Sequence, residues 1–160
     1  MPKVARKKSK SKVKEQVTTV VPKDRNPGMI MFVSFVVLMV VTSVVVYFAN
    51  MWFPSSVVLG TANISLLWAV LLSGAVIALI DTFAMPFLRE WEMKRKRDLS
   101  GKEMMVVYLM INVAAVWLVS RFAEIFGLGV ASWVVVLILA AVVNVVQGAV
   151  MVSWQKMMEK

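Results

Sequence analysis

The sequence predicts an all-α membrane protein that crosses the bilayer four times. The chain has 160 residues, of which 60% are hydrophobic, and its mean hydropathy is +0.79. Residues 26–80 contain no Asp, Glu, Lys or Arg, and residues 104–120 and 128–153 form two further charge-free stretches. A helix needs about 20 apolar residues to cross a bilayer. The first stretch therefore holds two crossings and each of the others holds one.

The first two spans are predicted at residues 29–49 and 64–85, joined by a turn at residues 50–63. Pro27-Gly28 separates the first span from the preceding tail. The first span is rich in valine, but in lipid every backbone N–H must be paired within the chain, so a helix is the default. Pro86 is expected to end the second helix.

The second pair of spans follows a charged loop. We predict that loop at residues 87–103, the third span at residues 104–120 and the fourth at residues 131–154. Gly127 and Gly129 mark the turn between them. The domain organisation is then a basic, disordered tail at 1–27, a transmembrane domain at 28–154 and a stub at 155–160.

The loop charges predict the orientation. The tail carries nine Lys or Arg residues and the central loop six, whereas the first turn has none. Lys and Arg accumulate in cytoplasmic loops. Four crossings with both termini in the cytoplasm place each basic cluster on that side. The predicted location is therefore the cytoplasmic membrane, and a cleavable signal peptide is not expected because no cleavage motif follows the first span.

The two halves of the chain resemble each other. An offset of 66 places Gly74, Ala78, Asp81 and Met85 on Ala140, Asn144, Gln147 and Met151. These positions form one face of each helix. The first and third helices align over Leu38-Met39 and Leu109-Met110, at an offset of 71. The pattern predicts a tandem repeat of two hairpins with parallel orientation and a first turn five residues longer than the second.

Polar and small side chains within the spans are the candidate functional residues. Asp81 is the only acid there; it is either an ion or proton site or a structural residue that snorkels or pairs with Arg89. Amide side chains in hydrocarbon need partners, and they either join helices or line a polar path. The candidate set for helix packing or a polar path is Gly74, Ala78, Asp81, Asn112, Ala140, Asn144 and Gln147.

The basic clusters are predicted to contact anionic lipids. The residues concerned are Arg6, Lys7, Lys8, Lys10, Lys12, Lys94, Arg95, Lys96 and Arg97. Nucleic acid is a poor partner for the tail, which has no aromatic residues for stacking. The chain contains no Cys, no His and no enzyme motif. No catalytic residue, metal site, cofactor or small-molecule substrate is therefore predicted.

Two segments, Trp68–Leu88 and Ile111–Gly148, resemble the phage holin family of the mycobacteriophage holin superfamily IV type. Asp81 stands where that family has Asn, and Met85-Pro86 stands where it has Arg-Pro. Asn112 matches the Asn of its third helix, and Leu128-Gly129 lies near its Gly-Phe turn. The long basic tail and the charged central loop depart from the family pattern. The resemblance implies a four-crossing protein that self-assembles in a bacterial cytoplasmic membrane.

The function expected from the sequence is that of a non-enzymatic, holin-like membrane protein that forms homo-oligomers. One alternative is a small transporter or channel subunit with a polar path through Asp81, Asn112, Asn144 and Gln147. A second alternative is a membrane anchor or scaffold that recruits anionic partners through the polybasic tail.

Overall fold

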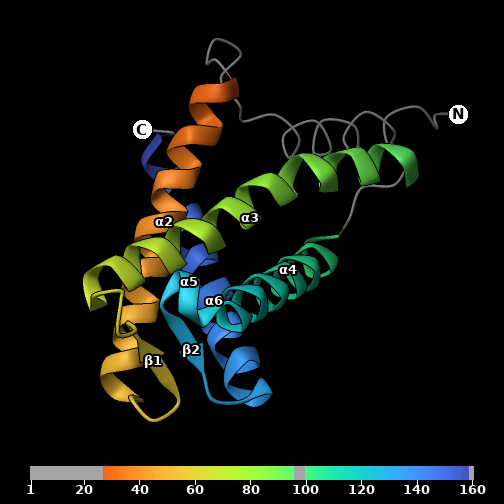
Figure 1. The fold of residues 1–160 in the computed structure, drawn as a ribbon. Helices are drawn as coiled ribbons and strands as arrows, with labels where there is room; N and C mark the ends of the chain where they lie inside the picture. The colour runs from red at the N-terminus through yellow and green to blue at the C-terminus, as the bar shows by residue number, and fades with distance from the viewer. Residues whose placement is uncertain (1–26, 96–99, 159–160) are drawn as a thin grey trace, which may run out of the picture. The chain divides into compact units, whose positions relative to one another are not determined.

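The computed structural model describes residues 27–95 and 100–158 (Figure 1). It divides into two units, Met1–Phe32 and Val33–Lys160, and the packing reported below lies within the second. The elements, in chain order, are α2 (Pro27–Trp52), β1 (Val57–Leu59), α3 (Leu66–Arg95), α4 (Gly101–Arg121), α5 (Ala123–Phe126), β2 (Leu128–Val130) and α6 (Trp133–Met158).

Four of these helices are long and apolar enough to cross a membrane. The segments are Gly28–Trp52, Leu66–Lys94, Lys102–Arg121 and Trp133–Met151. The prediction of an all-α polytopic protein with four transmembrane helices is confirmed.

The predicted end of the second helix at Met85 is wrong. Helix α3 continues through Pro86 to Arg95, so the first part of the expected central loop is helical. Proline is tolerated in transmembrane helices because neighbouring groups satisfy the freed carbonyl. Beyond Pro86 the sequence favours a helix, and Glu90 and Lys94 form an i, i+4 ion pair at 3.0 Å.

The last three residues of the predicted loop also belong to a helix. Helix α4 begins at Gly101, three residues before the predicted start at Met104. Ser100 and Glu103 form a reciprocal capping box. The Ser100 N–H donates to Glu103 Oε2 at 2.8 Å, and the Glu103 N–H donates to Ser100 Oγ at 3.4 Å. These two bonds satisfy donors that the first helical turn would leave unpaired.

The sequence did not predict the two short strands. Strands β1 and β2 pair antiparallel, with Val57 opposite Val130 and Leu59 opposite Leu128. They lie side by side where the turns of the two hairpins meet (Figure 1). Their inward side chains Val57, Leu59 and Leu128 join one core with residues of α2, α3, α4 and α6, among them Val46, Ile77, Val116 and Val136.

Burial confirms the predicted repeat. The pattern of buried and exposed residues along 66–85 recurs along 132–151, an offset of 66 (132 − 66). The strands repeat at an offset of 71 (128 − 57), and their pairing is unchanged when the halves are exchanged. The flanking backbone bonds obey the same exchange: Gly60 N–H donates to the Gly127 carbonyl at 2.8 Å, and Ala131 N–H to the Ser56 carbonyl at 2.9 Å. The strands and their flanking bonds are therefore related by a two-fold axis, and the burial pattern extends the equivalence of the halves to the helices.

The predicted offset of 71 for the first helices is wrong by one residue. The burial pattern of residues 33–52 recurs along 103–122, an offset of 70 (103 − 33). At an offset of 71, half-buried Met39 would correspond to Met110, which is 64% exposed. At 70, Met110 corresponds to Val40, which is also exposed. One extra residue between the third helix and its strand restores the offset of 71 at the strands.

Gly74 allows α3 to approach α2 closely. A Cβ atom at this position would overlap Ser43 Oγ and lie 3.2 Å from Ser43 Cβ and 3.3 Å from the Met39 carbonyl oxygen. Gly148, in α6, has no atom within 4 Å of its corresponding point. Gly74 therefore serves packing inside the chain, whereas Gly148 faces open space.

We expect Gly74→Ala to lower the melting temperature, because the new methyl group must push α2 away from α3. Overpacking of this kind costs about 1–3 kcal/mol. Gly148→Ala is the matched control and should melt at or above the wild-type temperature, since alanine is the better helix former. Thermal unfolding in detergent measures both variants, and an unchanged melting temperature for Gly74→Ala would contradict the close approach.

Candidate functional site

Four buried polar side chains, one from each membrane-spanning helix, meet inside the bundle. We call them the polar junction: Thr42 of α2, Asp81 of α3, Asn112 of α4 and Gln147 of α6. Their exposed fractions are 0%, 3%, 1% and 7%. The first and third correspond at the offset of 70, and the second and fourth at 66. The junction thus consists of two pairs of equivalent residues beside the two-fold axis.

Gln147 connects the other three members. Its Nε2 donates to Asp81 Oδ2 at 2.9 Å and to Thr42 Oγ1 at 3.1 Å, while its Oε1 accepts from Asn112 Nδ2 at 3.2 Å. Asn112 Nδ2 also donates to the Tyr108 carbonyl at 3.2 Å. Both N–H donors and the carbonyl oxygen of the Gln147 amide group are therefore hydrogen-bonded, and this one side chain joins four helices.

The junction lies deep in the spans. Asp81 and Gln147 follow the first residues of their helices by 15 (81 − 66) and 14 (147 − 133) positions, or about 22 Å of helix axis. Thr42 and Asn112 precede the ends of theirs by 10 (52 − 42) and 9 (121 − 112) positions, or about 15 Å. Each junction residue therefore lies at least nine residues, or about two and a half turns, from either end of its helix.

The expected snorkelling of Asp81, or its pairing with Arg89, is wrong. The carboxyl group is buried and its partner is Gln147 from the other half of the chain, whereas Arg89 is exposed. Arg89 stands eight residues (89 − 81) further along α3, about 12 Å along the axis. A buried position next to an amide group is thus preferred over a route to the headgroups.

Two acceptor atoms of the junction have no partner among the described residues. They are Asp81 Oδ1 and Asn112 Oδ1, and both are fully buried. A buried acceptor without a hydrogen bond costs about 1–3 kcal/mol, so each such atom requires an explanation.

The other predicted packing residues lie in two different environments. Gly74, Ala78 and Ala140 are buried within the chain. Asn144 is half-buried and outside the junction; its Nδ2 donates only weakly to the Met105 carbonyl, at 3.4 Å. The structure therefore brings together Asp81, Asn112 and Gln147 from the predicted set and leaves Asn144 apart.

Thr42 is the junction residue that the sequence did not identify. A threonine in a valine-rich span does not by itself indicate a polar site, because its hydroxyl commonly hydrogen-bonds to a carbonyl of its own helix. The useful signal was the repeat: at the offset of 70 Thr42 falls on Asn112, whereas the predicted offset of 71 pairs Asn112 with Val41. A misalignment by one residue concealed it.

Most residues predicted to contact anionic lipids lie outside the described residues, including the five in the tail, Lys96 and Arg97. Arg95 is the last residue of α3. Lys94 is exposed and bound to Glu90. The lipid contacts of these residues remain predictions.

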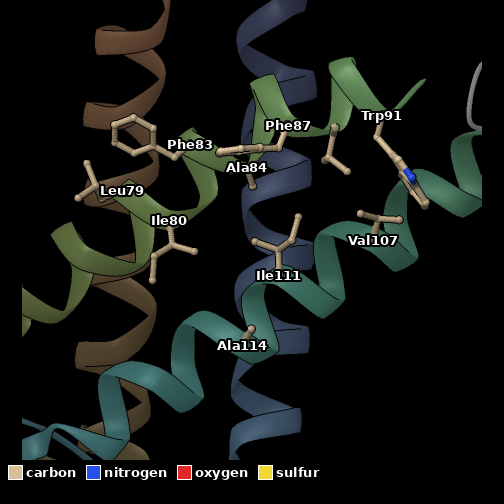
Figure 2. A pocket seen from close by; sticks show the side chains of 10 residues that line it. Leu79, Ile80, Phe83, Ala84, Phe87, Trp91, Val107, Ile111 and Ala114 are labelled. Carbon is tan, nitrogen blue, oxygen red and sulfur yellow. The ribbon is translucent and has the colours of Figure 1, made fainter. Parts of the chain in front are cut away.

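Two apolar grooves open on the sides of the bundle. Figure 2 shows the first, of about 640 Å³, between α3 and α4; its walls include Phe83, Phe87 and Trp91 on one side and Val107 and Ile111 on the other. The second, of about 530 Å³, runs between α2 and α6. The helix pairs are equivalent by the repeat, but the grooves lie at different heights, because the equivalents of Phe83, Phe87 and Trp91 do not line the second groove. Their apolar walls suit lipid chains and offer no polar route to the junction.

No protein-family model, curated protein or solved structure matches this chain. Within the described residues, no three His, Cys, Asp or Glu side chains lie close enough together to hold a metal ion.

We expect Gln147→Leu to destabilise the bundle by roughly 2–4 kcal/mol, because it removes three interhelical hydrogen bonds, each worth about 0.6–1.7 kcal/mol, and leaves their partners buried. Asn144→Leu, one turn away on α6, is the control and should cost under about 1 kcal/mol. Denaturant unfolding in mixed micelles measures both. Equal stability of the two variants would argue against the role of Gln147 as the connecting residue.

Proposed function

We propose that this chain is a non-enzymatic, holin-like integral membrane protein that self-associates in a bacterial cytoplasmic membrane, with both ends in the cytoplasm. One observation supports self-association. The face of α3 that carries Ala78 and Thr82 is buried within the chain, but the equivalent face of α6, which carries Asn144 and Gly148, is more open. The same helix surface is used for packing in one half and left available in the other.

The open face has the chemistry of a helix–helix contact in lipid. Gly148 leaves a notch, because no atom lies within 4 Å of the point where a Cβ would stand. Asn144, one turn earlier, retains an amide group whose bond to the Met105 carbonyl is long at 3.4 Å. Small residues permit close approach of two helices, and amide groups hydrogen-bond between them. A second copy of α6 would meet both requirements.

We expect Asn144→Leu and Gly148→Leu each to shift the chain toward monomers, with a loss of roughly tenfold in association constant, or about 1.4 kcal/mol. Val142→Leu, on the opposite side of α6, is the matched control and should associate as the wild type does. Single-molecule photobleaching in lipid bilayers counts the copies. An unchanged distribution in both test variants, with normal melting temperatures, would refute association through this face.

Membrane transport is the second candidate function, and the polar junction favours it. A buried acid at the middle of a transmembrane bundle is a common element of ion and proton pathways. If this function is correct, liposomes that contain the protein should show proton flux reported by an internal pH-sensitive dye. Asp81→Asn should abolish that flux, whereas Glu90→Gln, which removes an exposed acid, should not. Absence of flux with the wild-type protein would exclude this candidate.

A further inference from the structure

The two unpartnered oxygens of the polar junction correspond to a hydrogen bond that is present in the other half of the molecule. The two-fold axis exchanges Gln147 with Asp81 and Thr42 with Asn112. It therefore maps the bond from Gln147 Nε2 to Thr42 Oγ1 onto the pair Asp81 and Asn112. In that pair, the atoms left without partners are Asp81 Oδ1 and Asn112 Oδ1.

The missing component is a hydrogen-bond donor. Gln147 supplies its bond from an NH₂ group, whereas an ionised carboxylate at the equivalent position only accepts. Asn112 cannot provide the donor by reversing its amide group, because its Nδ2 already serves the Tyr108 carbonyl and Gln147 Oε1. One hydrogen shared between these two acceptors would satisfy both of them.

We propose that Asp81 holds a proton on Oδ1 and donates it to Asn112 Oδ1, so that the polar junction is a proton-binding site. The proton is taken from water, and the carboxylate becomes a neutral carboxylic acid. One proton satisfies both unpartnered atoms and completes the two-fold pattern of bonds.

Among the described residues, the recorded ion pair joins Lys94 to Glu90, and none involves Asp81. Residues 33–52 of α2, 104–120 of α4 and 133–155 of α6 carry no charge, and residues 66–88 of α3 carry none besides Asp81. Tyr108 is the titratable group beside the junction, and it interacts electrostatically with Asp81, Arg89 and Glu92. A buried carboxyl group without a paired charge is neutralised rather than kept ionised.

Infrared spectroscopy of the full chain in an ester-free detergent at pH 7 tests the proposal. The wild type should show the carbonyl stretch of a protonated carboxylic acid, and that band should shift when the aspartates carry ¹³C in the carboxyl group. Asp81→Asn should remove the band and Glu90→Gln should retain it. Asn112→Leu should move it to higher frequency, because the acid loses its acceptor.

Thermal unfolding provides a second readout that does not depend on the band. Asp81→Asn places an NH₂ group where the proton is proposed, so this variant should melt at or above the wild-type temperature. Replacing choline with Na⁺ in the buffer should leave the melting temperature of both proteins unchanged. The absence of an acid band from the labelled wild type would overturn the proposal, as would a band that persists in Asp81→Asn. Stabilisation of the wild type by Na⁺ would assign the site to a cation instead. None of these measurements depends on self-association or transport.

Discussion

The absence of hydrogen-bonding solvent inside a bilayer is the constraint on which this structure depends. Backbone groups in the spans are satisfied within helices, but side-chain amide and carboxyl groups must find partners on other helices. Gln147 meets this requirement for three residues at once. Because its partners lie on α2, α3 and α4, the same bonds that satisfy the polar groups also fix which helices are neighbours.

Duplication of a helical hairpin explains why the polar junction lies where it does. Equivalent residues that are close to a two-fold axis are also close to each other. A polar residue that faces the axis therefore lies beside the equivalent residue of the other half. Asp81 and Gln147 are such a pair, and so are Val58 and Gly129 at the centre of the two-stranded sheet. Two identical acids in contact would repel, whereas a carboxyl and an amide group complement each other.

The spans and their number could be predicted from the sequence because charge and hydropathy determine them directly. The end of α3 could not, since Pro86 breaks helices in water but is tolerated in a membrane bundle. The strands were hidden because each contains three residues and forms only through pairing with the other half. Three junction residues were identifiable as polar groups in apolar spans, whereas Thr42 required the correct offset between the halves.

The two halves have diverged in ways that separate stability from interaction. Asp81 and Gln147 differ, and that difference leaves two oxygen atoms of the junction without a donor among the described residues. Ala78 and Thr82 are covered, while Asn144 and Gly148 at the equivalent positions are open. The face of α3 packs inside the chain, but among the described residues the equivalent face of α6 has no matching partner. Asn144 and Gly148 are therefore the positions of α6 where a contact outside the chain is expected, whereas Gln147 holds the bundle together.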